Sequence, residues 1–109
     1  MATSLDFIKF VCDQTTGAGD LSYRKMFGEY VMYCDARPVF LVCDDTVYVK
    51  QLPVVAAIFE QFGITPDIGT PYDGARPHYI LDVENASLCE TMARTLAKVL
   101  PIPTRRQKK

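Results

Sequence analysis

The fold of this chain is decided by residues 21–50, which read LSYRKMFGEYVMYCDARPVFLVCDDTVYVK. Short segments rich in aromatic and β-branched side chains alternate with turn-forming residues, which is the pattern of β-strands. The turn signals fall at residues 35–38 and at residues 44–45. We therefore expect three or four short strands that pair antiparallel through tight connections.

The strands have these predicted limits. Residues 21–27 are extended in character, and Gly28 either separates them from the next strand or bends a single long one. Residues 29–34 and 39–43 are predicted to form a hairpin, and residues 46–50 a further strand.

The register of these strands decides which side chains face the core. With two-residue loops at 36–37 and 44–45, alternation places one purely apolar or aromatic set on a single face, Val31, Tyr33, Phe40, Val42, Val47 and Val49. We assign this face to the helix-covered core. The second face then carries Tyr30, Met32, Cys34, Val39, Leu41, Cys43, Tyr48 and Lys50. That face is more apolar than a solvated sheet face usually is, so we expect a loop or a second copy of the protein to cover it.

Helical patterns flank the strands at both ends of the chain. Residues 4–15 are predicted to form a helix, with Thr3 as its N-cap and Asp6 completing a capping box. A last helix follows a second capping box, formed by Ser87 and Glu90.

A middle helix begins at Pro53, which suits a first helical turn, and ends at Gly63. Residues 64–77 show neither a helix nor a strand pattern, and residues 78–83 read as a last strand. The sequence therefore predicts an α+β two-layer sandwich, in which a mainly antiparallel sheet of about four or five strands packs against about three helices.

Charge is unevenly distributed along the 109 residues. We expect a single domain over residues 1–103 and a basic, disordered tail over residues 104–109. The tail holds four of the twelve basic residues and no acid, so the rest of the chain has eight basic and thirteen acidic residues, a net charge of −5. An acidic body is a poor match to a phosphate-binding surface, whereas the tail adds salt-sensitive attraction to anions.

The four cysteines are Cys12, Cys34, Cys43 and Cys89. They form no CxxC pair, and one histidine does not complete an ordinary zinc site with them. No apolar run approaches the ~18 residues of a membrane span, and no signal peptide precedes the first helix. We therefore expect a reduced, cytoplasmic protein without metal, cofactor or membrane contact, whose cysteines are core residues.

The segments YRKMFGEYVMYCDARPVFLVCDDTVYVK (residues 23–50) and PYDGARPHYIL (residues 71–81) resemble the N-terminal domain of the TfoX/Sxy family. The resemblance covers roughly residues 4–100, and RKMFGEY followed by a hairpin and CDD is its most specific part. It implies a small α+β sandwich. TfoX/Sxy proteins are bacterial regulators of natural competence, associated with transcription that depends on the cyclic-AMP receptor protein. Full-length members add a helical C-terminal domain, whereas the resemblance here implies a stand-alone N-terminal domain without catalytic residues.

One candidate partner-binding group flanks residues 26–28, where Gly28 bends or interrupts the strand, and its members are Arg24, Lys25, Glu29 and Tyr30. It is either a recognition patch for an acidic or phosphate-bearing partner, or a set divided between opposite strand faces, with one cation paired to an acid. Tyr48, on the apolar second face, joins the predicted interaction surface.

A second candidate is the loop that contains Tyr72, Arg76 and His78, residue types that are enriched in binding hot spots or able to act as a general base. The alternative is a loop fixed by its own tyrosine and proline packing. No serine or cysteine nucleophile is spaced near His78 by a known motif. The adjacent pair Asp44 and Asp45 is interpreted as a solvated turn rather than a metal site.

These features define three competing functions. We expect a non-enzymatic regulatory domain that acts through protein contacts. Its expected partners include the transcription machinery, and we expect the domain to form a homodimer. The alternative is a nucleic-acid-binding transcription regulator that uses the basic tail together with Arg24 and Lys25. The third is an enzyme that uses His78 or a cysteine, and the lack of a catalytic motif disfavours it.

Overall fold

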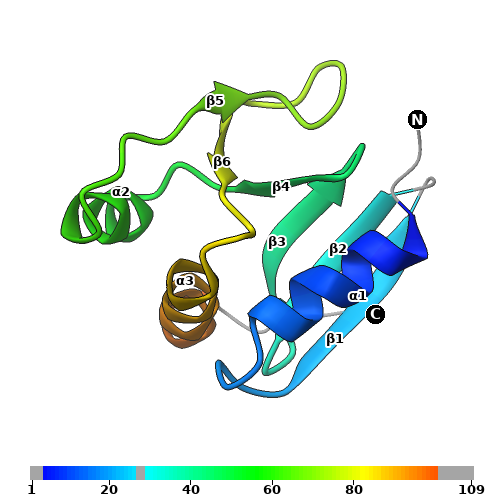
Figure 1. The fold of residues 1–109 in the computed structure, drawn as a ribbon. Coiled ribbons are helices and arrows are strands. Elements are labelled where there is room, and N and C mark those ends of the chain that lie inside the picture. The colour runs from blue at the N-terminus through cyan, green and yellow to red at the C-terminus, as the bar shows by residue number, and fades with distance from the viewer. Residues whose placement is uncertain (1–3, 27–28, 101–109) are drawn as a thin grey trace, which may run out of the picture.

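The computed structural model describes residues 4–26 and 29–100, which form a two-layer α+β domain (Figure 1). The helices are α1 (Leu5–Gln14), α2 (Pro53–Gln61) and α3 (Ala86–Val99). The strands are β1 (Leu21–Met26), β2 (Glu29–Cys34), β3 (Arg37–Cys43), β4 (Thr46–Val49), β5 (Ile68–Gly69) and β6 (His78–Leu81). None of the described helices has the length and hydrophobicity that a membrane span requires.

The strands form one sheet in the order β1-β2-β3-β4-β6-β5, and all neighbours are antiparallel. The predicted fold class is confirmed, with one strand more than expected. The additional strand is β5, which falls inside the predicted irregular segment 64–77. A strand of only two residues is too short to show an alternating pattern, so no sequence pattern predicted it.

The helices pack on one face of the sheet, which we call the inner face (Figure 1). The side chains that α1 contributes to the core are Ile8 and Val11, and α2 contributes Val55, Ile58 and Phe59. The strands contribute the buried residues Tyr30, Met32, Cys34, Phe40, Val42, Val47, Val49 and Leu81. The predicted core positions in β3 and β4 are therefore confirmed.

The predicted core positions in β2, Val31 and Tyr33, are wrong. They are half-buried, whereas Met32 and Cys34 are fully buried. The connecting turn is residues 35–36 and not 36–37, because Cys34 pairs with Arg37. This shift of one residue exchanges the two faces of β2.

A β-bulge in β3 corrects the one-residue change of register, so that only the faces of β2 differ from the prediction. The register changes between Met32 and Tyr33, which pair with Phe40 and Pro38, so Val39 is an extra residue in β3. Below the bulge, Val42 pairs with Tyr30 on the inner face. The bulge thus lets Phe40 and Val42 stay in the core although the turn falls one residue earlier than predicted.

Residues with positive φ make both tight turns. Asp35 and Ala36 have φ values of 53° and 70°, and Asp44 and Asp45 have 52° and 55°. Two consecutive residues in this left-handed region are typical of the hairpin turn that matches the twist of paired strands, and aspartate tolerates it better than most residues. The predicted two-residue loop at 44–45 is confirmed, since Cys43 pairs with its far side at Thr46.

Two helix caps differ from their predictions. Ser4 caps α1, and its hydroxyl accepts a hydrogen bond from the Phe7 N–H at 3.1 Å. The predicted cap, Thr3, lies outside the described residues. Asn85 caps α3 by accepting from the Leu88 N–H at 3.1 Å, so the capping box predicted at Ser87 and Glu90 is wrong. An asparagine next to the first turn competes equally well for this position.

Other boundaries agree closely with the predictions. The middle helix begins at Pro53 and is followed by Gly63 with φ 71°. Residues 21–34 form two separate strands, although Gly28 itself lies outside the described residues. β3 begins two residues earlier than predicted, and β6 ends at Leu81 rather than at residue 83. The predicted tail, residues 104–109, also lies outside the described residues.

The corrected register of β2 can be tested with a pair of aspartate substitutions. Met32→Asp buries a carboxylate in the core and is expected to cost on the order of several kcal/mol, enough to abolish cooperative unfolding in a domain of ordinary stability. Tyr33→Asp places the charge at a half-buried site on the opposite face, so this variant is expected to fold. Circular dichroism during urea unfolding measures both. A stable Met32→Asp variant beside an unfolded Tyr33→Asp variant would mean that the sequence-based register was right.

Candidate partner-binding site

The opposite face of the sheet, which we call the outer face, has none of the three described helices packed on it (Figure 1). The strand pairings place half-buried side chains from four strands on this face, namely Val31, Leu41, Tyr48, His78 and Ile80. A sheet face with this many apolar groups needs a cover or a partner.

A hollow on this face, which we call the outer groove, lies between the first strands and the loop after β5. Its volume is about 560 Å³, and its lining is Met26, Glu29, Tyr30, Val31, Leu41, Cys43, Pro71 and Tyr72. The lining is predominantly apolar, and the volume lies within the range of pockets that hold small molecules or partner side chains. The predicted covering loop therefore exists, but it covers only one end of the face.

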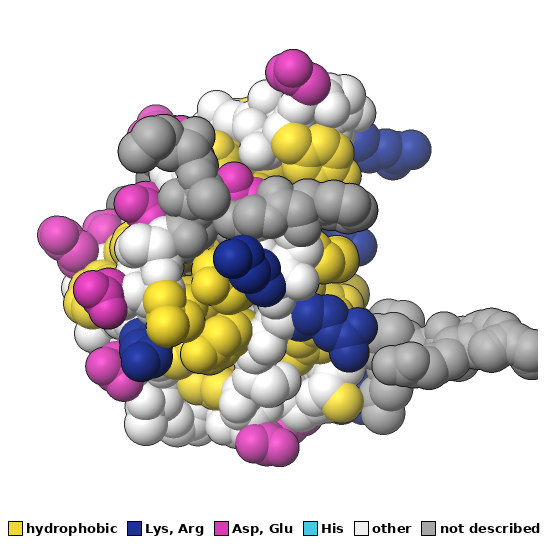
Figure 2. Space-filling model, turned by 90° about the vertical axis from the view of Figure 1, so that its right-hand side faces the viewer, with side chains coloured by type: hydrophobic (Ala, Val, Ile, Leu, Met, Phe, Trp, Pro, Cys, Tyr) yellow, Lys and Arg dark blue, Asp and Glu magenta, His cyan; other side chains and the backbone are white. Residues whose placement is uncertain are grey.

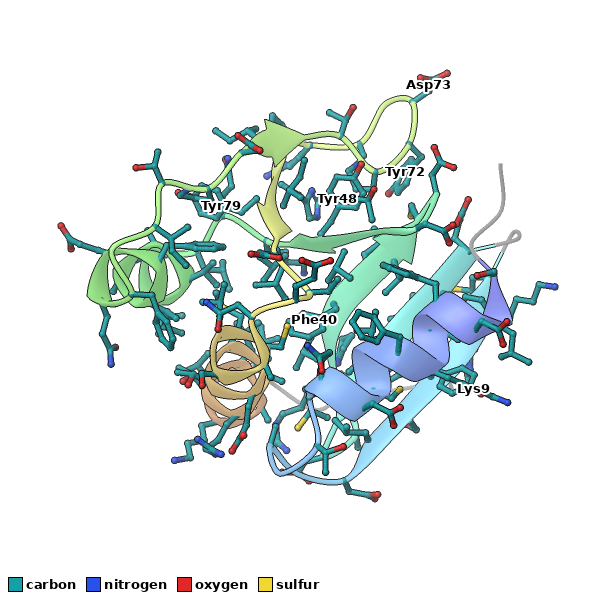
Figure 3. The ribbon with its side chains drawn as sticks, in the orientation of Figure 1. Lys9, Phe40, Tyr48, Tyr72, Asp73 and Tyr79 are labelled. Atoms are coloured by element: carbon teal, nitrogen blue, oxygen red, sulfur yellow. The ribbon has the colours of Figure 1, made fainter. Side chains whose placement is uncertain are left out.

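Two exposed side chains stand at the rim of the outer groove. Tyr72 is 61% exposed and Met26 is 40% exposed. Figure 3 shows Asp73 at the outer tip of the loop and Tyr72 on the side nearer the sheet. An exposed aromatic ring beside an apolar hollow is the usual composition of a hot spot in a protein interface.

A second, smaller hollow continues the outer groove across the face. It has a volume of about 160 Å³ and shares Val31 and Leu41 with the outer groove. Tyr48, His78 and Leu100 are among its other lining residues. The side chains of Val31 and Leu41 therefore border both hollows.

The end of the outer groove nearest the β3–β4 turn is acidic. The Glu29 carboxylate accepts a hydrogen bond from the backbone N–H of Asp44 at 3.0 Å, which ties the turn to β2. Asp45 accepts a hydrogen bond from the Ser4 N–H at 3.1 Å. The predicted site residue Glu29 therefore has a structural role and also contributes negative charge at the groove.

Tyr48 and His78 pack together at the other end of the face, where their rings meet edge to face with centroids 6.4 Å apart. Gly69 makes room for this packing, since a Cβ at that position would lie 3.3 Å from the Tyr48 ring and 3.2 Å from Ile80. Burial, followed by the nearby Cys43 and Asp44, raises the pKa of Tyr48.

His78 is held by its own loop, because its Nδ1–H donates to the carbonyl oxygen of Arg76 at 2.7 Å. Arg76 itself is exposed. Together with Lys50 the two residues line an open hollow of about 510 Å³, which gives this end of the face a basic character. The outer face is thus acidic near Glu29 and basic near Arg76.

The predicted hairpin patch is not assembled as one surface. Arg24 pairs with Val31 and Lys25 pairs with Tyr30, so the two cations lie on opposite faces of β1. Tyr30 is 7% exposed and packs edge to face against Tyr23, with centroids 5.5 Å apart. Of this predicted group, Arg24 and Glu29 face outward, whereas Lys25 and the ring of Tyr30 belong to the inner side.

The structure adds three lining residues that the sequence did not single out, Met26, Val31 and Pro71. Val31 was assigned to the core because the register of β2 was one residue off. Met26 and Pro71 belong to segments far apart in the chain, and no local pattern shows that they meet.

The four cysteines differ in how deeply they lie in the domain. All four are free thiols, and Cys34, Cys43 and Cys89 are buried. Burial and nearby acids raise the pKa of Cys43 to about 11 and that of Cys89 to about 12. Within residues 4–26 and 29–100, no three histidine, cysteine, aspartate or glutamate side chains gather as a possible metal site.

The fold and this surface define a small α+β domain whose described helices all pack on one side of the sheet. Comparison with known proteins gives the family: the chain belongs to the TfoX N-terminal domain family, whose model matches residues 13–98. It is similar to a protein of Spirochaeta aurantia described as an uncharacterized 12.7 kDa protein in the trpE 5' region. The two are 34% identical over 111 residues, which cover 100% of this chain and 93% of the relative.

The raised thiol pKa values predict slow alkylation of Cys43. Its pKa is raised from 9.0 to about 11. At pH 8 the native thiolate fraction is therefore roughly a hundredfold lower than that of an ordinary thiol, and it grows only as the pH approaches 11. We expect iodoacetamide to modify Cys43 at least that much more slowly in the native protein than in urea, as measured by peptide mass spectrometry. Rapid native modification at neutral pH would instead indicate an activated cysteine.

Proposed function

We propose that this TfoX N-terminal domain is a non-enzymatic regulatory domain that binds a segment of another protein in its outer groove. The observation that carries the proposal is the apolar groove on the helix-free face of the sheet, with exposed Tyr72 and Met26 at its rim. Removing such a surface from water is the main driving force of protein association.

The charges around the outer groove specify the partner's chemistry. Glu29 and Asp44 lie beside the apolar lining, and residues 1–103 carry a net charge of −5. The complementary ligand is a protein segment with one large apolar side chain as its anchor and Lys or Arg next to it. We place the anchor over Val31 and Leu41 and the cation near Glu29.

Other features support binding rather than catalysis. His78 is held by the Arg76 carbonyl, and Cys43 and Cys89 have raised pKa values. Four free thiols favour a reducing, cytoplasmic setting. Family membership favours a bacterial regulatory role in which a component of the transcription machinery is the partner.

A peptide selection tests the proposal. A displayed library of random peptides is selected on the wild-type protein, and enriched peptides are expected to combine an apolar anchor with adjacent Lys or Arg. Leu41→Asp places a charge in the groove and is expected to weaken these peptides at least tenfold in a fluorescence titration. Ile68→Asp, at a 59% exposed site on β5 outside the groove, is the matched control and should bind like the wild type.

Three outcomes of the selection would overturn the proposal. These are the absence of an enriched motif, a motif without an apolar anchor, and binding that Leu41→Asp leaves unchanged. Circular dichroism shows whether each variant is folded. Should Leu41→Asp unfold, amide chemical-shift changes on adding an enriched peptide to the wild type decide, and changes confined to residues outside the groove count against the proposal.

Nucleic acid is the second candidate ligand, favoured by the basic end of the outer face at Lys50 and Arg76. A protein that binds nucleic acid is expected to bind a short DNA duplex with an affinity that falls steeply as the salt concentration rises. Either deletion of residues 104–109 or the substitution Arg76→Ala is expected to lower that affinity. The acidic body leads us to expect no binding at physiological salt. Fluorescence anisotropy at two salt concentrations measures this, and DNA binding that is still detected at physiological salt and is weakened by these changes would replace the protein-binding proposal.

A further inference from the structure

The edge of the sheet at β1 is a second surface that the proposed function does not use. β1 is the outermost strand on its side, and five of its six residues are exposed. The other edge strand, β5, has only two residues. Long open edges are unusual in natural sheets, because their unpaired N–H and C=O groups can pair with another strand.

The phase of the ladder shows which backbone groups of β1 point outward. Next to the Leu21–Cys34 pair, the Asp35 N–H donates a hydrogen bond to the Asp20 carbonyl oxygen at 2.8 Å, and hydrogen-bonded pairs alternate along an antiparallel ladder. Alternate residues of β1 therefore bond to β2. Leu21, Tyr23 and Lys25 consequently direct their N–H and C=O groups away from the sheet.

Apolar side chains flank this open edge. Tyr23 is 39% exposed on the inner face, and α1, which lies across the same face, exposes Leu5 (47%) and Phe10 (40%). Figure 2 views this side of the molecule and shows hydrophobic side chains gathered in its middle, with Lys and Arg side chains among them. The edge thus combines backbone hydrogen-bonding groups with an apolar patch.

We propose that β1 pairs antiparallel with β1 of a second copy of this protein, about a two-fold axis at Tyr23, to give one continuous sheet. The axis stands perpendicular to the sheet, so α1 of both copies lies on the same side and the two apolar patches adjoin. Outward-facing backbone groups at Tyr23 then bond to the same groups of the other copy.

In this register no two like charges of the paired copies lie directly opposite each other. With the axis at Tyr23, Arg24 lies opposite Ser22 of the other copy and Lys25 lies opposite Leu21. The two tyrosines face each other, and aromatic cross-strand pairs are favourable. An axis at Arg24 would set the two Arg24 cations opposite each other, and an axis at Ser22 would pair only residues 21–23 of the strand. The register at Tyr23 pairs residues 21–25 without opposing like charges.

A charge-swap experiment tests this arrangement. By light scattering the wild type is expected to approach twice the monomer mass of 12.2 kDa as concentration rises. Because position 23 faces itself, Tyr23→Asp and Tyr23→Lys should each be monomeric. An equimolar mixture of the two should regain the dimer mass, since Asp then faces Lys. Ile68→Asp on the opposite edge strand is the control and should remain dimeric.

Each alternative result overturns the proposal. A wild type that is monomeric at every concentration excludes the dimer, and folded Tyr23 variants that stay dimeric place the interface elsewhere. Folded variants whose mixture stays monomeric exclude the axis at Tyr23. If both variants unfold, hydrogen exchange of the wild type decides: protection of the Leu21, Tyr23 and Lys25 amides must increase with protein concentration. Groove binding is unaffected by these outcomes, because Leu41 and Tyr23 lie on different faces.

Discussion

The β-bulge between β2 and β3 is the constraint on which the rest of the structure depends. The turn at Asp35 and Ala36 fixes one register, and the bulge at Val39 restores another within two residues. Together they place Met32, Phe40 and Val42 in the core, and they leave Val31 and Leu41 on the outer face. Without the extra residue in β3, either β2 or β3 would turn its apolar set toward the wrong side of the sheet.

Side-chain hydrogen bonds fix the ends of this hairpin to neighbouring parts of the chain. The Asp35 carboxylate accepts a hydrogen bond from the Asp20 N–H at 2.8 Å, and Gly19 leaves the space in which that carboxylate lies. At the opposite end, the Glu29 carboxylate accepts from the Asp44 N–H. The Arg37 Nε–H donates to the Leu100 carbonyl at 2.8 Å and ties the end of α3 to the start of β3. The sheet is therefore fixed by its turns as well as by its core.

The sequence was sufficient for features with strong local signals. Pro53 and Gly63 mark the middle helix, and the two aspartates at 44–45 mark a turn, because these residue types have few alternative conformational roles. The faces of β2 were not predictable in the same way. Tyr30 through Cys34 are all apolar or aromatic, so alternation carries no information there, and the position of the turn had to decide.

The candidate site was predictable only in part for a related reason. Tyr72 and Tyr48 were identified as aromatic residues in a loop and on an apolar sheet face. The groove, however, lies between Val31 and Leu41 on the sheet and Pro71 on a loop. This arrangement depends on the register of β2 and on the pairing of β5 with β6, neither of which leaves a local signal. Arg24 and Lys25 lie on opposite faces of β1, as the second interpretation of the hairpin group expected from strand alternation.

The central claim is that the sheet has one closed face and one open face that binds a protein. The most direct test is methyl relaxation of the wild-type protein by a soluble paramagnetic probe, followed by NMR. The account predicts strong relaxation of the Val31 and Leu41 methyl groups and protection of those of Val42, Val47 and Val49. Protection of Val31 and Leu41 equal to that of Val42 would contradict it, because the outer face would then be covered and unable to receive a partner.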